Sequence, residues 1–312
     1  MDTTIAAKAG PKRYVLLTAA FNEEAHFAKT LSSVASQTCP PEKWVVVSDG
    51  STDQTDAITL EYAKDHSFIE LLRREKDPRH DFASKVHALT AGFEILKSLS
   101  FEFIGNLDAD ISFGPTYFAD LFLRFEHEPH LGIAGGSIFE WDGERFRARA
   151  GNRTRSVAGA VQMFRRECFE AIGGLLPLPY GGEDWCAEVM ARMRGWEVRC
   201  FPDLQVNHHR PTGEASGRLR YSYRQGLMDY SLGVHPIFDF IKISRRVRFG
   251  NALGAVARLT GFFLATCRGD KRVVSKEFVE FLRKDQMARI KAYLRSGRGD
   301  GRDPSLESDT LS

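Results

Sequence analysis

Cysteine is scarce in this sequence, and long apolar runs are missing from it. The five cysteines are widely spaced and none belongs to a Cys-x-x-Cys pair, so neither a zinc site nor a disulfide framework is indicated. Such cysteine usage is typical of the reducing cytoplasm, where we expect the protein to act. No stretch has 18 uninterrupted apolar residues, and no apolar run precedes Lys8 and Lys12. We therefore expect neither a membrane-spanning helix nor a secretory signal.

Charge is unevenly divided along the chain, although the net charge is only +2. Residues 218–312 contain 19 Lys/Arg and 10 Asp/Glu, a net charge of +9, which leaves −7 for residues 1–217. Acidic clusters favour a metal, whereas a basic segment favours phosphates, nucleic acid or an anionic membrane surface. We therefore expect different partners for the two parts.

Short apolar runs alternate with helical patterns in the first part of the chain. Strands are expected at residues 14–20, 44–48, 69–72 and 101–107, with helices between them that end near residues 36, 65 and 96. The first of these helices is expected to begin at residues 22–24, with Asn22 as its cap. This alternation implies an α/β fold with a Rossmann-like, mainly parallel sheet and helices on both faces. Further strands are expected at residues 132–136, 159–164, 198–201 and 204–206, and a further helix at residues 183–194.

The same patterns predict four segments. Residues 1–12 are expected to be a disordered lead-in and residues 13–217 the α/β domain. Residues 218–295 are expected to be a basic helical extension. Residues 296–312, rich in Gly, Asp and Ser, are expected to be a disordered tail.

Polar residues gather where three of the expected strands end, at residues 18–23, 49–53 and 108–110. In parallel α/β sheets, ligands bind at the carboxyl ends of the strands. Three polar clusters at such ends therefore predict one shared site at this edge of the sheet.

Acidic and histidine residues near these ends suggest a metal. Asp108 and Asp110 lie two residues apart after a strand, so their carboxylates can converge on one hard cation such as Mg²⁺ or Mn²⁺. The alternative is an ordinary polar turn. His208 and His209 follow a later strand, where one of them either supplies a metal ligand or has a purely structural role.

Other polar residues also allow two interpretations. Asp49 either caps the following helix or accepts a hydrogen bond from a nucleobase. Glu183 and Asp184 follow two glycines, and they either cap a helix or supply a general base. Arg210 fits a phosphate.

Taken together, these residues resemble the family 2 glycosyltransferases, which have the GT-A fold. The resemblance covers about residues 12–213 and rests on the order and spacing of its motifs. It implies that residues 13–217 are a GT-A catalytic domain. Ser48 departs from the family pattern, which usually has an acid there. The motifs, in chain order, are residues 18–24, 45–53, 83–89, 108–110, 183–184 and 208–209.

The resemblance implies a role for each motif. Asp184 is the implied general base. Asp110, with Asp108 and one of His208 and His209, is implied to bind Mg²⁺ or Mn²⁺. The implied donor-binding residues are Thr18, Ala20, Asn22, Glu23, Asp49, Ser51, Lys85, Asp108, Ala109, Glu183 and Arg210.

The implied activity is an inverting, metal-dependent transfer of one sugar from a nucleoside diphosphate sugar, most often UDP-linked. The acceptor is a hydroxyl of a saccharide or lipid-linked glycan, as in bacterial exopolysaccharide or cell-surface glycan synthesis. Residues 224–226 lie near the place of the Gln-x-x-Arg-Trp motif of processive members but lack its Trp, which favours a single addition. A nucleotidyltransferase would show a Gly-rich phosphate loop after the first strand. A non-catalytic sugar-nucleotide-binding assembly protein would not need Asp184 and the late histidine together.

Residues 241–272 mix apolar residues with arginines. Such a stretch predicts peripheral contact with an anionic membrane, at the inner face of the plasma membrane. The alternative is a helical cap with a solvated basic face. Aromatic residues are poorly interleaved with basic ones here, so we expect no nucleic-acid partner. The arginines are Arg245, Arg246, Arg248, Arg258, Arg268 and Arg272.

Overall fold

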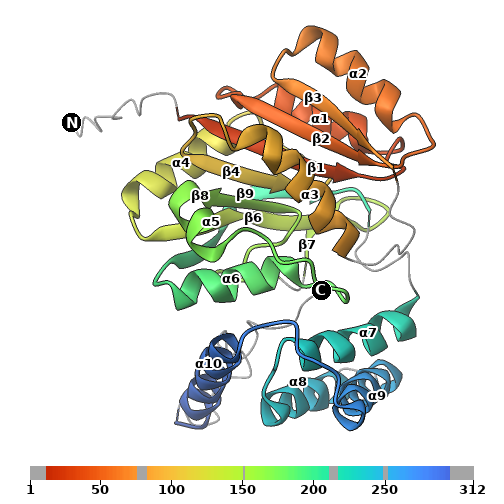
Figure 1. Ribbon diagram of the computed structural model, residues 1–312, viewed down its shortest axis with the longest axis vertical. Helices are drawn as coiled ribbons and strands as arrows, with labels where there is room; N and C mark the ends of the chain where they lie inside the picture. Colours follow the sequence, from red (N-terminus) through yellow and green to blue (C-terminus); the bar gives the residue numbers. More distant parts are fainter. Residues whose placement is uncertain (1–11, 76–82, 150–151, 211–216, 249–251, 296–312) are drawn as a thin grey trace.

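The computed structural model of the chain describes residues 12–75, 83–149, 152–210, 217–248 and 252–295. Within these ranges a nine-stranded sheet carries helices on both faces, and further helices lie below it in the view of Figure 1. The expected disordered tail, and all but the last residue of the expected lead-in, lie outside the described residues.

The first half of the sheet is parallel, as the sequence predicts. β1 (Tyr14–Ala20) pairs with β2 (Lys43–Asp49) and β4 (Phe103–Leu107), and β2 pairs with β3 (Ile69–Arg74). β1 and β2 are buried along almost their whole length, which explains why their apolar runs are continuous instead of alternating. The helices between these strands are α1 (Phe27–Ala35), α2 (Thr55–Asp65) and α3 (Ala83–Leu96).

Helix α1 begins later than predicted. The sequence predicts a start at Asn22, with its side chain as the cap, whereas α1 begins at Phe27. Asn22 has a φ of 55°, in the left-handed region, and its Oδ1 accepts a hydrogen bond from the backbone N of Thr52 at 2.8 Å. The Asn22 side chain is therefore used to join two loops, and the residues before α1 form a loop at the carboxyl edge of the sheet.

Antiparallel pairs enter the sheet after β4. The strand order is β3-β2-β1-β4-β8-β6-β9-β5, with β7 paired to β6. The two strands predicted at residues 198–201 and 204–206 are one strand, β9, which has an irregular register opposite Gly136 and Ser137. The elements of this half are β5 (Ile111–Phe113), α4 (Tyr117–His127), β6 (Leu131–Trp141), β7 (Phe146–Ala148), β8 (Val161–Arg165), α5 (Arg166–Ile172), α6 (Glu183–Met193) and β9 (Glu197–His208).

Each face of the sheet has its own apolar core. On one face, Leu16 of β1 belongs to a cluster with Phe27 of α1 and Phe118 of α4. On the other, Leu17 of β1 belongs to a cluster that includes Leu89 of α3 and residues of α5 and α6. Because helices cover both faces, the carboxyl ends of the strands are the place where a ligand can approach the sheet.

The described chain after residue 217 is helical, as predicted. An apolar cluster joins three of the four described helices in this part to α6 through Trp185, Met228, Leu232, Phe238 and Phe278. Among the described residues, no helix combines the length and the apolar character needed to cross a bilayer. The helices are α7 (Arg218–Ser231), α8 (Pro236–Arg248), α9 (Ala252–Arg268) and α10 (Lys276–Arg295).

Arg258 belongs neither to a membrane-contacting face nor to a solvated basic face, so both interpretations of residues 241–272 are wrong for this arginine. Its side chain is fully buried, and its Nε donates a hydrogen bond to Asp229 Oδ2 at 2.7 Å. Lys242 donates to the other oxygen of Asp229 at 3.2 Å, so the buried charges connect α7, α8 and α9. A buried guanidinium requires such partners because desolvating an unpaired charge costs several kcal/mol.

Candidate active site

A cavity of about 460 Å³ opens at the carboxyl ends of β1, β2 and β4. The starts of α3 and α6 and the residue two positions beyond β9 complete its walls. Nine of its twelve lining residues are predicted site residues, so the structure brings most of them together. The lining residues are Ala19, Ala20, Phe21, Glu23, Asp49, Ser84, Lys85, Asp108, Ala109, Asp110, Glu183 and Arg210.

Asp108, Asp110 and His208 form a group of three possible metal ligands. One ligand atom of each lies within 4.8 Å of the others. The closest contact is between His208 Nε2 and Asp110 Oδ1, at 3.2 Å. His208 is the last residue of β9 and is paired with Ile111 of β5. Because Ile111 directly follows Asp110, this pairing brings the histidine beside the aspartates.

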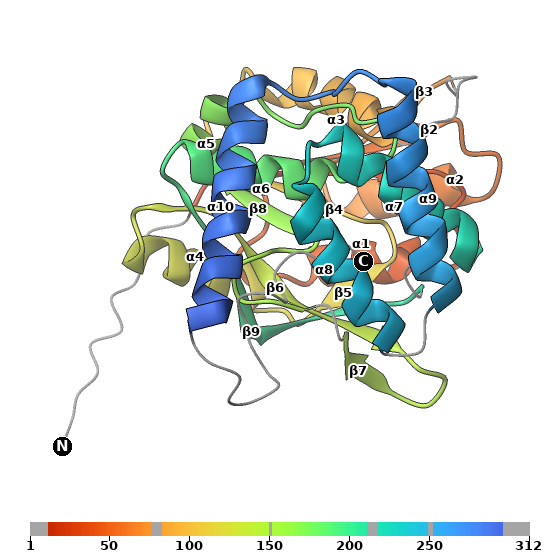
Figure 2. The ribbon, with the colours of Figure 1, turned by 90° about the horizontal axis from the view of Figure 1, so that it is seen from below.

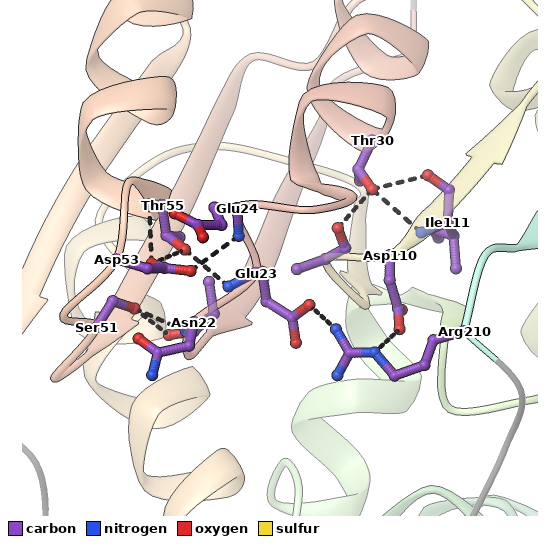
Figure 3. Close-up of polar contacts among 12 residues, drawn as sticks. Asn22, Glu23, Glu24, Thr30, Ser51, Asp53, Thr55, Asp110, Ile111 and Arg210 are labelled. Carbon is purple, nitrogen blue, oxygen red and sulfur yellow. Dashed lines mark hydrogen bonds and ion pairs between the residues drawn. The ribbon is translucent and has the colours of Figure 1, made fainter. Parts of the chain in front are cut away.

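Helix α1 holds the turn that carries the aspartates through Thr30. Thr30 is fully buried, and its Oγ1 lies 2.9 Å from the carbonyl oxygen of Ala109 and 2.7 Å from that of Ile111. The same oxygen accepts a hydrogen bond from Ile111 N at 3.1 Å (Figure 3). This clamp holds the backbone between and after the two carboxylates in place.

The charges of the cluster stabilise one another. Burial alone would raise the pKa of Asp110, but His208 and the cations Arg210 and Lys85 hold it below its usual range. Burial alone would lower the pKa of His208, but the Asp110 carboxylate outweighs it and raises the pKa. Glu140 Oε1 lies 4.0 Å from His208 Nδ1, which is too far for a hydrogen bond, but its negative charge also raises the pKa of His208.

Two carboxylates and an imidazole provide suitable donors for Mn²⁺ or Mg²⁺. The three side chains come from two separate strand ends that the sheet holds close together, and Asp110 and His208 are both largely buried. The residues present therefore fit the divalent cation that the sequence predicts.

His209 is separate from this group. Its Nε2 lies 2.8 Å from Ser112 Oγ, and its Nδ1 lies 3.5 Å from Lys29 Nζ. Its ring also stacks on that of His26. Burial, followed by the nearby Lys29 charge, lowers the pKa of His209 to about 4. Of the two predicted histidines, only His208 has its side chain at the aspartates, whereas His209 contacts Asp110 through its backbone N, which donates to the Asp110 carbonyl oxygen at 2.9 Å.

Two cations each connect two carboxylates around the cavity. Lys85 Nζ donates to Asp108 Oδ1 at 2.7 Å and lies 3.9 Å from Glu183 Oε1. Arg210 forms an ion pair with Glu23, and its Nε lies 3.6 Å from Asp110 Oδ2 (Figure 3). Lys85 and Arg210 thus point donors into a cavity that otherwise concentrates negative charge.

The pKa values of Glu23 and Lys85 are both raised, for different reasons. Burial raises the pKa of Glu23 to about 7, although Arg210 opposes the shift. For Lys85 burial acts in the opposite direction, but the charges of Asp108 and Glu183 outweigh it and raise the pKa. Lys85 is therefore a permanent cation at this site.

Asn22 and Ser51, predicted to bind the donor, do not line the cavity but tie the two loops beside it. Ser51 Oγ accepts a hydrogen bond from Asn22 N at 3.2 Å, and Thr55 Oγ1 accepts one from Glu23 N at 2.8 Å. Asp53 Oδ2 accepts a third hydrogen bond, from Glu24 N, at 3.0 Å (Figure 3). These bonds hold the loop that presents the Glu23 carboxylate.

Thr18 and Asp49 are placed differently from each other. Thr18 is fully buried inside β1, and its Oγ1 accepts a hydrogen bond from Trp44 Nε1 at 3.0 Å, so it does not reach the cavity. Asp49 lines the cavity at the end of β2 and is mostly buried. Its Oδ1 lies 3.6 Å from Arg74 Nη1 on the neighbouring strand.

The acidic pair at the start of α6 faces two ways. Glu183 lines the cavity, whereas Asp184 is not among its lining residues. Asp184 Oδ2 accepts a hydrogen bond from Gly159 N at 3.1 Å, and Oδ1 accepts one from Trp185 N at 2.8 Å. A Cβ atom at position 159 would lie 2.8 Å from Asp184 Oδ2, so this approach requires glycine.

A family model described as glycosyl transferase family 2 matches residues 16–176, slightly more than half of the chain. The chain belongs to glycosyl transferase family 2. The matched region contains β1 to β4, the loops after them and the Asp108–Asp110 turn. The protein is therefore a glycosyltransferase, as its sequence motifs predict.

Curated relatives in the family include poly-beta-1,6-N-acetyl-D-glucosamine synthases. That of Staphylococcus epidermidis is 32% identical over 128 residues, and that of Staphylococcus aureus strain COL is 27% identical over 124. Each match covers 39% of this chain and 27% of the relative, so the similar part is about a quarter of the relatives' length.

Solved structures support the GT-A fold. The mannosyltransferase PcManGT from Pyrobaculum calidifontis, in complex with GDP-Man and Mn²⁺, has a TM-score of 0.56 and 17% identity, covering 93% of this chain and 84% of that one. Residues 1–349 of Staphylococcus aureus TarS, in complex with UDP-GlcNAc, give 0.56 and 16% identity, covering 95% and 89%. At these identities the likeness shows the fold alone, and it confirms the predicted fold.

Sequence reasoning missed several residues at or beside the site. Ala19, Phe21 and Ser84 line the cavity and lie inside the motifs at residues 18–24 and 83–89, but the implied donor-binding residues do not include them. Glu140 reaches His208 only because β6 pairs with β9, with Glu140 opposite His208. Glu188 was also missed, because nothing in the residues around it in the sequence indicates a role at the site.

Glu188 of α6 is fully buried and fixes the loop that contacts Asp184. Its Oε1 accepts hydrogen bonds from Val157 N at 2.6 Å and from Ser156 Oγ at 3.2 Å. Gly159, two residues further along this loop, donates to Asp184. Burial raises the pKa of Glu188 from 4.5 to about 8, although the Arg192 charge opposes the shift.

A pH series should show this buried carboxyl. Because the folded pKa is raised, the Glu188 proton stabilises the fold fully below pH 4.5, and this stabilisation is lost as pH rises through 8. From pH 5 to 9 the wild type should lose up to roughly 3–5 kcal/mol of unfolding free energy relative to Glu188→Gln. Urea denaturation measures this difference. The exposed control Glu94→Gln should follow the wild type, and parallel profiles for wild type and Glu188→Gln would contradict the assignment.

Proposed function

We propose that this glycosyltransferase moves one sugar from a nucleoside diphosphate sugar, UDP-linked, to a hydroxyl acceptor, with metal dependence and inversion at the anomeric carbon. The observation that carries this proposal is the convergence of Asp108, Asp110 and His208 beside a cavity that also holds Lys85 and Arg210. A metal site and two cations at one cavity match the charge of a diphosphate.

The donor fits the cavity by size and by chemistry. The cavity volume of about 460 Å³ lies in the range of small-molecule sites. Asp49, at the end of β2, accepts an N–H of the base, and Lys85 and Arg210 contact the phosphates. Glu23, Ala20 and Ala109 complete the walls. The TarS structure with UDP-GlcNAc and the PcManGT structure with GDP-Man support a sugar nucleotide as the donor class.

Asp108, Asp110 and His208 would hold Mn²⁺ or Mg²⁺. When bound, such a cation neutralises negative charge that grows on the departing diphosphate. Arg210 adds a fixed guanidinium at the same place. Because leaving-group charge develops only in the transition state, these groups raise kcat more than they lower KM.

Asp184 is the proposed general base. It stands beside Glu183 at the start of α6, and two backbone N–H bonds fix its carboxylate while lone pairs remain on both oxygens. It removes the proton from the acceptor hydroxyl, whose oxygen then attacks the anomeric carbon opposite the leaving diphosphate. One displacement of this kind inverts the configuration.

The proposed acceptor is a saccharide or a lipid-linked glycan of the cell surface, met at the inner face of the plasma membrane. The names of the poly-beta-1,6-N-acetyl-D-glucosamine synthases support a role in surface polysaccharide synthesis. A single addition is proposed because the chain lacks the Gln-x-x-Arg-Trp motif of processive enzymes. Nucleic acid is not a proposed partner.

Hydrolysis of UDP-, GDP- and dTDP-sugars with Mn²⁺ or with EDTA tests this function. The wild type should release UDP from a UDP-sugar only with metal present. His208→Ala should lower that rate at least about 100-fold, because one of three metal ligands is removed. His209→Ala, the matched control, should retain it. Donor binding without turnover would indicate a sugar-nucleotide-binding assembly protein instead, and release of pyrophosphate from UTP and a sugar 1-phosphate, without release of UDP from the UDP-sugar, would indicate a nucleotidyltransferase.

Replacing the proposed base separates chemistry from binding. Asp184→Asn should lower kcat about 10²–10⁴-fold and leave donor affinity nearly unchanged, since Asp184 does not line the cavity. Glu183→Gln should instead alter donor affinity, because Glu183 lines the cavity near Lys85. Steady-state kinetics and calorimetry with UDP measure the two effects. Undiminished turnover in Asp184→Asn would remove this residue from the mechanism.

A further inference from the structure

Helices α8 and α9 expose a concentration of large apolar side chains. Of thirteen exposed large hydrophobic residues in the described chain, seven lie on these two helices, with 39–73% of each residue exposed. Scattered single apolar residues are normal on a protein surface, but a group of this size marks an interaction site. We call these seven the α8–α9 face: Ile237, Phe240, Val247, Leu253, Val256, Leu259 and Phe263.

The spacing of these residues puts them on the outer side of each helix. On α8 the inner residues Phe238 and Ile243 are buried, with Phe238 in the cluster that includes Trp185 of α6. On α9 the inner residues Ala255 and Arg258 are buried. The exposed residues of each helix follow one another at helical spacing on the side opposite these buried residues, so they point outward. Figure 2, which views the molecule from below, shows α8 and α9 side by side on the face turned to the reader, and these helices pack against each other.

The packing of α9 on α7 does not need the exposed side chains. A Cβ atom on Gly226 of α7 would lie 2.0 Å from the carbonyl oxygen of Arg258, and one on Gly261 of α9 would lie 2.2 Å from that of Tyr223. The two backbones therefore touch, and the Arg258–Asp229 ion pair fixes the contact from inside. The outer apolar residues are consequently not part of the core of the fold.

Basic residues accompany the α8–α9 face. Residues 236–272 contain eight Lys/Arg and two Asp/Glu, a net charge of +6. Lys242 and Arg258 are used internally with Asp229, whereas Arg268, Lys271 and Arg272 are exposed at the end of α9. The sequence adds Arg245, Arg246 and Arg248 at the end of α8, whose side chains lie outside the described part of the structure.

We infer that the α8–α9 face docks on an anionic lipid bilayer, with both helices lying in the membrane surface. Outward apolar side chains enter the boundary of the acyl chains, and the adjoining cations contact anionic headgroups. A second copy of the chain is a poorer occupant, because a twofold interface would bring like charges together. This agrees with the absence of a spanning helix among the described residues.

Docking in this way would place the sugar-transfer site at the membrane. The cluster that packs α7, α8 and α10 on α6 includes Trp185, one residue after Asp184, the proposed base. Gly182, just before the acidic pair, lies so close to Met228 of α7 that a Cβ atom there would be 2.8 Å from its sulfur. The acceptor class that follows is a lipid-linked glycan, and this last step rests on the proposed function.

Vesicle flotation of the full chain tests the docking surface. Wild type should float with phosphatidylcholine vesicles containing 30% phosphatidylglycerol, and raising the salt to about 0.5 M should weaken binding through screening. Phe240→Ser with Phe263→Ser should lower vesicle affinity at least about tenfold, because two large apolar groups are lost. Leu60→Ser, which changes a similarly exposed residue on α2, is the matched control and should bind as wild type.

Three results would overturn the inference. These are no flotation of the wild type, equal flotation of the double variant, or a wild-type dimer that the double variant converts to a monomer in light scattering. Thermal denaturation checks that the double variant folds. Donor hydrolysis in solution should be the same in wild type and double variant, so loss of vesicle binding alone would not contradict the proposed function.

Discussion

Charge balance at the carboxyl edge of the sheet is the constraint on which the site depends. Five carboxylates line one cavity of about 460 Å³, and partly buried like charges repel one another. Lys85 lies between Asp108 and Glu183, and Arg210 lies between Glu23 and Asp110. His208, whose Nε2 lies 3.2 Å from Asp110 Oδ1, helps to hold the pKa of Asp110 low. A place with so many acidic oxygens and a few fixed cations suits a divalent metal together with a diphosphate.

The fold supplies these charges from elements that are themselves fixed. Thr30 clamps the turn that carries the two aspartates, and hydrogen bonds between the first two loops hold Glu23. β9 returns beside β5 and brings His208 to the same edge. On the opposite side of the cavity, α6 carries Glu183 at its start and packs on the helices after residue 217. Donor site, proposed base and α8–α9 face are thus parts of one packed arrangement.

The sequence predicts the parallel half of the fold and the strand-end cluster well, because continuous apolar runs and polar residues after them are local signals. It cannot choose between His208 and His209, since that choice depends on how β9 pairs with β5 and β6. It misplaces Thr18, whose hydroxyl is used by Trp44 inside the sheet. It also takes Arg258 for a surface residue, because its partner Asp229 is 29 residues away on another helix.

We propose that Asp108, Asp110 and His208 together hold the cation that joins the protein to the donor diphosphate. Anomalous X-ray diffraction from crystals grown with Mn²⁺ and UDP can test this metal site. We expect one manganese peak, bonded to side-chain atoms of these residues and to phosphate oxygens of UDP. A manganese ion bound to UDP without a contact to His208 or either aspartate, or UDP bound in the cavity with no manganese, would contradict it.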